Sequence, residues 1–190
     1  MQTTRNRNPI DVDGQARNDS VMSTLSIDDI VQILELRLLP EEGGLFRETY
    51  RSALTLPPHI LAPGYSGARS LSTAIYYLIT PDQFSALHRV RGDEAFHFYL
   101  GDPVEMLVLR PDATGEIVTL GTDLAAGMRP QMIVPGGVWQ GTRLRDGGSF
   151  ALLGTTMAPG FDVADFEIGE RAALIARYPE QAAAITRMTR

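Results

Sequence analysis

Short runs of strand-forming residues, each ended by Gly, Pro or Asp, dominate the chain between residues 45 and 156. Within several runs, apolar and polar positions alternate, which is typical of strands with one buried face. Nine strands are predicted, over residues 45–51, 72–79, 85–90, 95–100, 104–109, 117–120, 131–134, 139–144 and 150–156. No helical pattern lies between them, so the crossovers that a parallel sheet needs are missing. The pattern predicts an all-β, mainly antiparallel barrel or sandwich.

Helical patterns are confined to the two ends of the chain. Ser26 and Asp29 form a capping-box-like start before apolar residues at helical spacing, and this helix is expected to end at Pro40. A Glu-Glu-Gly-Gly turn follows it. Two short helices are predicted over residues 169–177 and 179–188, with Pro179 suited to a first helical position. The polar residues 1–25 are interpreted as a flexible N-terminal tail, which leaves residues 26–190 as one domain.

Composition narrows the function classes. The 190 residues carry 23 acidic and 17 Lys or Arg side chains, a net charge of -6, with no basic run that could follow phosphates. Nucleic acid is therefore not expected as a partner. There is no cysteine, which excludes disulfides, thiolate metal sites and cysteine nucleophiles and fits a cytoplasmic protein. No stretch approaches the roughly 18 apolar residues of a membrane span, so no membrane partner is expected.

The densest polar set within strand-like sequence lies between residues 85 and 101. An imidazole and a carboxylate on one face can divide acid and base roles or bind a metal together. Strand alternation puts His88 and Val90 on one side, and Glu94 with Phe96 on the facing side of the next strand. His97 then points the other way. The pattern makes His88 and Glu94 the candidate catalytic pair.

These residues resemble the first motif of the cupin superfamily, which reads glycine, five residues, His-x-His, three or four residues, Glu, six residues, glycine. His88 occupies the first histidine position, and Glu94 and Gly101 have the motif's separation. Two positions depart from it, because Val90 stands at the second histidine and Asp82 at the leading glycine.

The second cupin motif has Pro-x-Gly, two residues and His at its centre, and residues 135–140, Pro-Gly-Gly-Val-Trp-Gln, are similar to it. Gln140 takes the place of the histidine that normally binds metal. Of the four usual metal positions, His88 and Glu94 retain good ligands, Gln140 offers a neutral amide oxygen, and Val90 offers nothing. The sequence therefore predicts a site without a cofactor, and a divalent metal held by His88, Glu94 and Gln140 is the alternative.

A closer resemblance is to the uncharacterised fifth cupin family, described as similar to sugar epimerases. It is carried by LLPEEGGLFRETYRS from Leu38, SALHRVRGDEAFHFYLGDP from Ser85, VPGGVWQGT from Val134 and APGFDVADFE from Ala158. The resemblance implies a cupin, RmlC-like jelly-roll β-barrel with a short N-terminal helix and C-terminal helices. It also implies a homodimer and a pocket between the sheets, lined by the two motifs.

Six further residues are candidates for contact with a substrate: Gln140, Trp139, Gln131, Phe96, Tyr76 and Tyr50. Alternation lets only one of Trp139 and Gln140 point inward, and the motif favours Gln140. Trp139 is either a pocket wall or part of the core or a dimer interface. Gln131 is expected to reach the pocket from a neighbouring strand. The two tyrosines either donate a hydroxyl or simply occupy strands.

Three hypotheses follow for function. The leading one is a cofactor-free isomerase, epimerase or cyclase that acts by proton transfer on a sugar-like or polyketide-like metabolite. In it His88 is the base or acid, Glu94 orients it or is the complementary group, and Gln140 or a tyrosine holds a substrate oxygen. The second is a metal-dependent cupin, a lyase or oxygenase using Fe, Mn, Ni or Zn. The third is a protein that binds a small molecule without converting it.

Overall fold

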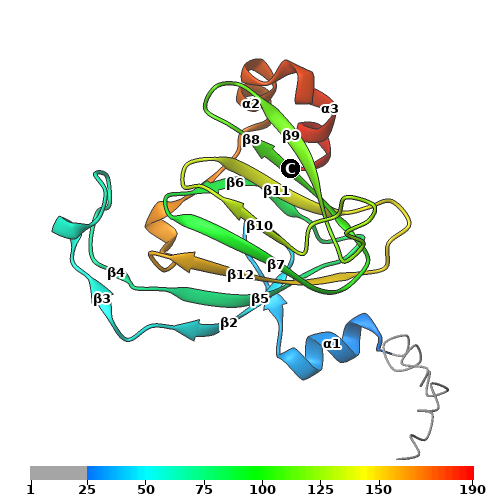
Figure 1. Cartoon of the computed structure of the whole chain (residues 1–190), viewed down its shortest axis with the longest axis horizontal. Coiled ribbons are helices and arrows are strands. Elements are labelled where there is room, and N and C mark those ends of the chain that lie inside the picture. Colours follow the sequence, from blue (N-terminus) through cyan, green and yellow to red (C-terminus); the bar gives the residue numbers. More distant parts are fainter. Residues whose placement is uncertain (1–24) are drawn as a thin grey trace, which may run out of the picture.

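The computed structural model describes residues 25–190, whose main feature is two antiparallel sheets packed face to face (Figure 1). The six-stranded sheet has the order β1 (Arg37–Leu38), β2 (Leu45–Arg51), β5 (Thr73–Ile79), β12 (Ala151–Ala158), β7 (Asp93–Gly101) and β10 (Gln131–Val134). The five-stranded sheet has the order β13 (Phe166–Ile168), β6 (Ser85–Val90), β11 (Trp139–Leu144), β8 (Val104–Leu109) and β9 (Gly115–Leu120). This jelly-roll arrangement confirms the predicted fold class.

The main core lies between the two sheets. Tyr77, Phe96 and Leu153 come from the six-stranded sheet and Met106 and Leu120 from the five-stranded sheet, each at most 2% exposed. Burial of a large apolar side chain of this kind contributes about 1.5–3 kcal/mol. The strands follow the predicted ranges closely because the alternation that marks them in the sequence is the alternation that fills this core.

The N-terminal helix is shorter than predicted. Helix α1 (Ile27–Leu34) begins at the expected capping box on Ser26 but ends six residues before Pro40. Glu35 adopts the left-handed conformation, with φ of 53°, which stops the helix. The chain then enters β1, which pairs with β2. Helix α1 packs on the outer face of the six-stranded sheet through Ile30.

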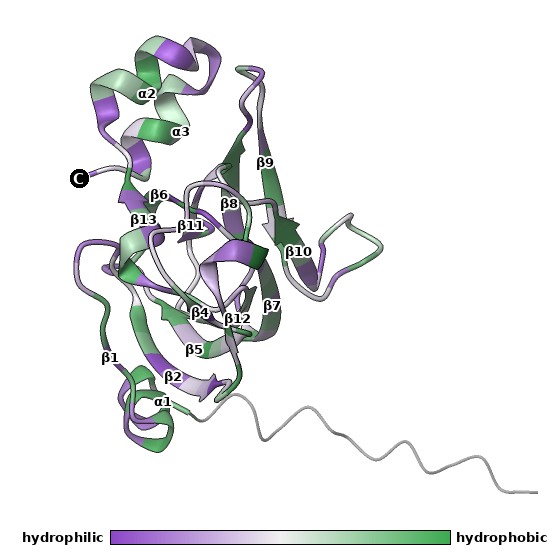
Figure 2. Cartoon of the chain, turned by 90° about the vertical axis from the view of Figure 1, so that its left-hand side faces the viewer, coloured by the Kyte–Doolittle hydropathy of each residue, from purple (hydrophilic) through white to green (hydrophobic). Residues whose placement is uncertain are grey.

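The C-terminal helices cover the other sheet. Helix α2 (Arg171–Arg177), the 3-10 turn η3 (Pro179–Gln181) and helix α3 (Ala182–Arg187) lie close to the two predicted ranges. Leu174, Ile185 and Met188 pack against Leu87 and Leu107 on the outer face of the five-stranded sheet. Figure 2 shows α2 and α3 beside β6 and β13, at the end of the molecule away from α1. Each sheet is therefore covered on its outer side by a helix from one end of the chain.

Besides β1, three further short strands were not predicted. Strands β3 (Thr55–Leu56) and β4 (Arg69–Ser70) form a small ribbon beyond β2, with the 3-10 turn η1 (Pro58–Ile60) between them. Strand β13 follows the 3-10 turn η2 (Val163–Asp165) and pairs with β6. Arg69 and Asp165 join these segments through two hydrogen bonds of 2.7 and 2.9 Å. Runs of two or three residues carry too little alternation to be recognised.

The predicted tail over residues 1–25 falls, except for its last residue, outside the described residues. Within the described part of the chain, no helix has the length and apolar character needed to cross a membrane.

Candidate functional site

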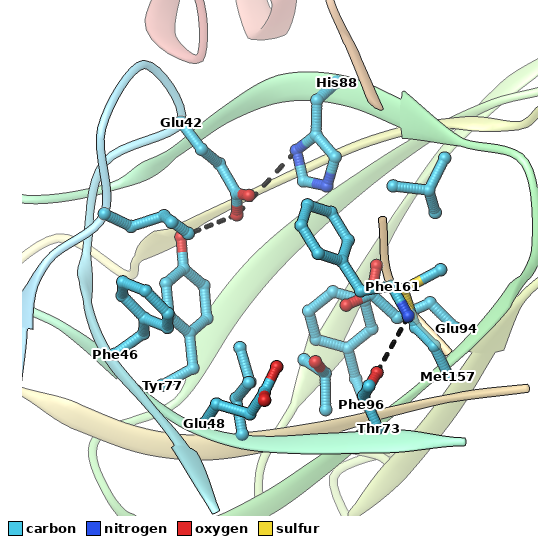
Figure 3. Close-up of a pocket in the computed structure, with 14 residues that line it drawn as sticks. Glu42, Phe46, Glu48, Thr73, Tyr77, His88, Glu94, Phe96, Met157 and Phe161 are labelled. Atoms are coloured by element: carbon cyan, nitrogen blue, oxygen red, sulfur yellow. Dashed lines mark hydrogen bonds and ion pairs between the residues drawn. The ribbon is translucent and has the colours of Figure 1, made fainter. Parts of the chain in front are cut away.

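A cavity of about 70 Å³ opens between the two sheets, next to the turn that joins β1 and β2 (Figure 3). Strands β2, β5, β6, β7 and β12 supply most of its wall. Its lining residues are Leu39, Glu42, Phe46, Glu48, Thr73, Ile75, Tyr77, His88, Val90, Glu94, Phe96, Thr155, Met157 and Phe161. Roughly 10–15 Å³ of such volume holds one water molecule. The space therefore suits a compact group of a few non-hydrogen atoms.

His88 lies on β6 with its imidazole at the cavity wall, and the residue is only 2% exposed. Its Nδ1 lies 2.8 Å from the carbonyl oxygen of Ala86, which can only accept a hydrogen bond. Nδ1 therefore carries the proton of the neutral ring, and Nε2 carries the lone pair. The ring also stacks on Phe166, with centroids 5.3 Å apart. These contacts fix both the tautomer and the orientation of the imidazole.

Glu94 begins the inward face of β7 and is 7% exposed. The Gln140 Nε2 group donates a hydrogen bond of 2.5 Å to its Oε2 and lies 3.4 Å from the Nε2 of His88. Gln140 is opposite His88 in the β11–β6 register, so one amide spans the two candidate catalytic groups. Burial raises the pKa of Glu94 above its ordinary value, against the opposing effects of His88 and of hydrogen bonds from Thr155 and Gln140.

The cavity holds a third polar group, Glu42, which the sequence analysis did not identify. The Oε1 atom of Glu42 accepts hydrogen bonds of 2.8 Å from the hydroxyls of Tyr77 and Ser85. The same oxygen lies 3.9 Å from Nδ1 of His88, and Figure 3 shows the two side chains facing each other. Burial, followed by the charge of Glu42, raises the pKa of Tyr77 well above its usual range. Tyr77 therefore acts as a hydrogen-bond donor rather than as a phenolate.

The turn explains why Glu42 was missed. Gly43 and Gly44 were predicted as turn residues, and both have positive φ, of 91° and 72°. Alternation carries no information within such a turn, so the sequence gives no direction for the carboxylate before it. The one signal in the sequence is that Glu42 falls within the phrase from Leu38 that resembles the fifth cupin family.

Comparison with known proteins agrees with this architecture. Residues 28–169 match the family described as Cupin superfamily (DUF985). The chain belongs to this cupin family. A curated relative, the Uncharacterized protein YML079W of Saccharomyces cerevisiae, is 32% identical over 132 residues, which span 65% of this chain and 66%, just under two thirds, of the yeast protein.

Solved structures resemble this cupin over most of its length. Protein SO0799 from Shewanella oneidensis is 34% identical with a TM-score of 0.76, covering 87% of this chain and 98% of that one. A hypothetical protein from Leishmania major is 31% identical with a TM-score of 0.77, covering 87% and 99%. A cupin 2 domain-containing protein from Halorhodospira halophila, 10% identical with a TM-score of 0.50 over 80% and 86%, shares the fold alone.

The residues at the usual cupin metal positions do not match the donor set of a cupin metal site. Val90 lines the cavity with an alkyl side chain, which offers no donor atom. Gln140 turns its NH₂ group, not its oxygen, toward Glu94 and His88, and an amide N–H is not a metal ligand. Among the described residues, no group of three or more His, Asp or Glu is arranged to hold a metal ion. The donor set does not fit a divalent cation.

The other predicted contact residues divide between the cavity and the outer surface. Phe96 lines the cavity, and Gln140 is 1% exposed beside His88. Trp139 does not line this cavity. It packs with the C-terminal helices, and the Arg89 guanidinium lies 4.6 Å from its ring centroid. The choice of Gln140 over Trp139 as the inward residue agrees with this placement.

Gln131, Tyr76 and Tyr50 also lie outside the cavity. Gln131 is exposed on β10 and contacts His97 at 3.3 Å, which corrects the expectation that it reaches the pocket. Tyr76 packs edge-on against Tyr99 on the outer side of the six-stranded sheet. Tyr50 is 54% exposed. Tyr76 and Gln131 lie in the outward phase of their strands, next to the inward residues Tyr77 and Met132. Tyr50 points outward because a register shift after Glu48 pairs it with Ala74.

Strand β2 departs from simple alternation. Simple alternation would place Arg51 on the opposite face from Glu48, but a register shift between Glu48 and Tyr50 brings the two together, with hydrogen bonds of 2.7 and 2.9 Å. A bulge of this kind re-aims the side chains on either side of it. Glu48 consequently lines the cavity with its charge paired.

Proposed function

We propose that this cupin is a small-molecule enzyme of the isomerase, epimerase or cyclase type that moves a proton on its substrate. The observation that carries the proposal is the meeting of His88 and Glu94 on one mostly apolar cavity, with Gln140 bonded between them. Two titratable groups with different environments are the usual basis for dividing acid and base roles. The similarity of the family to sugar epimerases is consistent with chemistry of this kind.

The geometry supports a specific division of roles. The bond from Nδ1 to the Ala86 carbonyl leaves the Nε2 lone pair of His88 as the base. Its 3.4 Å contact with Gln140 is longer than an ordinary hydrogen bond, so an incoming substrate can replace it. Glu94 has a raised pKa and therefore retains a proton to higher pH than a free glutamate, which suits it as the acid.

The proposed step balances without another reactant. A C–H proton next to a substrate carbonyl passes to Nε2 of His88, while the carboxyl proton of Glu94 passes to the carbonyl oxygen and gives an enol. Return of the His88 proton to the same carbon, while the enol hydroxyl gives its proton back to Glu94, restores the carbonyl, and it inverts the configuration when the planar enol has turned its other face to His88. If the substrate carries a hydroxyl on the reacting carbon, return of the His88 proton to the former carbonyl carbon, with that hydroxyl giving its proton to Glu94, moves the carbonyl. A pair of this kind supplies roughly a hundredfold or more in rate. The homodimer expected from the family stays a prediction.

Deuterium exchange into simple carbonyl compounds tests the proposal even though the natural substrate is unidentified. The protein is incubated in D₂O with hydroxyacetone, aminoacetone or pyruvate, and NMR follows loss of the C–H signal next to each carbonyl. Exchange is expected with at least one compound, and His88→Gln and Glu94→Gln should each slow it by roughly a hundredfold. Glu180→Gln, on the exposed turn before α3, is the matched control and should leave it unchanged.

Three outcomes would contradict proton transfer by this pair. The first is that all three compounds exchange no faster with the protein than in buffer alone. The second is that wild type and both variants exchange at equal rates. Retention of a ligand through purification, with no product detectable by mass spectrometry, would instead indicate the non-catalytic binding protein.

A further inference from the structure

The charged side chains on the cavity wall are predominantly acidic. Among the described residues that line it, three are carboxylates, Glu42, Glu48 and Glu94, and none is Lys or Arg. Glu48 is neutralised by Arg51, whose guanidinium makes two hydrogen bonds with it. Glu94 is the proposed proton donor and is neutral in that state. Glu42 is the carboxylate whose charge then decides the electrostatics of the cavity.

Glu42 has no cationic partner among the described residues. Its side chain is 13% exposed, and its hydrogen bonds come from the neutral hydroxyls of Tyr77 and Ser85. The imidazole of His88 is 3.9 Å away, but its Nδ1 proton is directed to the carbonyl of Ala86. A largely buried carboxylate without a counter-charge is unfavourable, and functional sites are where such groups are retained.

Aromatic side chains form much of the remaining wall. Phe46, Phe96, Phe161 and Tyr77 all line the cavity (Figure 3). The faces of aromatic rings carry negative electrostatic potential and attract cations, whereas they offer nothing to an anion. Rings and an uncompensated carboxylate together favour positive charge. An anionic group would meet both the charge of Glu42 and a wall without basic residues.

We propose that the ligand of this cavity is a small primary amine bound as its ammonium ion, with Glu42 as its ionic partner. The amine form is favoured because its N–H groups can bond to the carboxylate while its carbon chain contacts the rings. The volume of about 70 Å³ limits the enclosed part to a few non-hydrogen atoms. This inference rests on the proposed function, which supplies the carbonyl next to the reacting carbon. It adds the amine, so that the substrate class is an amine-bearing carbonyl compound.

Binding titrations that vary only ligand charge test this assignment. Propylammonium, tetramethylammonium and propionate are titrated into the full chain at neutral pH, and binding is read from protein amide shifts in NMR. Propylammonium should bind at least about tenfold more tightly than propionate. Glu42→Gln should weaken propylammonium about tenfold or more and leave propionate equal or tighter. The exposed Glu180→Gln variant should match wild type.

Glu42→Asp guards against misfolding of the first variant, because it keeps the charge and should keep the preference for ammonium. Equal or tighter binding of propionate overturns the proposal, as does unchanged propylammonium affinity in Glu42→Gln or no binding of any of the three compounds. Tetramethylammonium equal to propylammonium overturns the role of the N–H groups. If Mn²⁺ or Zn²⁺ bound more tightly than propylammonium and displaced it, the site would be assigned to a metal instead.

Failure here is separable from failure of proton transfer. If wild type still exchanges hydroxyacetone and His88→Gln does not, while propylammonium shows no preference, then only the ligand class is wrong. If propylammonium binds as expected and no carbonyl compound exchanges, the cavity is an amine site without the proposed chemistry.

Discussion

Replacing Glu94 by Gln is expected to stabilise the protein at neutral pH while slowing the proposed proton transfer by roughly a hundredfold. Glu94 is 7% exposed, and Gln140, which bonds to it, is a neutral amide. Gln has nearly the same shape as Glu, so packing is preserved. The variant removes the ionisable group, and its amide can pair with Gln140 once that side chain turns its unpartnered Oε1 toward it.

The direction of the pKa shift of Glu94 decides at which pH the variant is more stable than wild type. Because burial raises the folded-state pKa of Glu94 above its unfolded value, folding favours the protonated acid. Stability from this group is fully present below the unfolded pKa and is lost as pH rises through the folded pKa. Wild type therefore bears the cost of a buried carboxylate at higher pH, and the variant does not. The two should differ little in acid and most above neutrality.

The magnitude follows from the cost of leaving a buried polar group without full compensation, about 1–3 kcal/mol. For a chain of this size, 1 kcal/mol corresponds to about 2–4 °C in Tm. The Glu94→Gln variant should therefore unfold about 2–12 °C above wild type at mildly alkaline pH, and near the wild-type temperature at acidic pH.

Thermal unfolding followed by circular dichroism, over a series of buffers from acidic to alkaline, measures this difference. Glu180→Gln, which removes an exposed carboxylate, controls for the change in net charge and should follow wild type at every pH. A Glu94→Gln variant less stable than wild type above neutrality would refute the reasoning, as would a stability difference that shrinks as pH rises. Either result would mean that Glu94 is held as a stabilising carboxylate.

Three further changes test other parts of the structure. Arg69→Ala should cost about 3–5 kcal/mol in urea unfolding, because it strips a buried Asp165 of its bidentate partner. The double change Val90→His with Gln140→His places histidines at the two cupin positions that lack a good metal ligand. In calorimetry this variant should bind Mn²⁺ or Zn²⁺ at least about tenfold more tightly than wild type. Equal affinities would contradict the argument that the wild-type donor set does not fit a metal. Gly136→Ala should lower the free energy of unfolding by about 2 kcal/mol or more, because the added methyl would overlap a backbone carbonyl oxygen of the β6–β7 turn. Thermal unfolding measures this, and an unchanged Tm would show that the turn can move aside.

Much of the fold was predictable, for a reason visible in single strands. In β7 the inward residues Glu94, Phe96 and Phe98 are buried and Tyr99 is half exposed, which is the alternation read from the sequence. A period of two is a local property of the backbone, so it survives any tertiary arrangement. The same reasoning placed His88 and Glu94 on one cavity. It could not predict that α1 stops at Leu34, since a left-handed residue and a two-residue strand leave no periodic trace.

The sequence by itself determined the nine longer strands, the antiparallel class and the placing of one imidazole and one carboxylate on the same cavity, because alternation and motif spacing are encoded within each segment. Tertiary structure alone decided which other groups join them. Glu42 reaches the cavity because a glycine turn folds back over the barrel, and Glu48 is neutralised because a bulge in β2 turns Arg51 toward it. Turns and bulges have no period, so the alternation in the sequence does not show how these two carboxylates set the charge of the cavity.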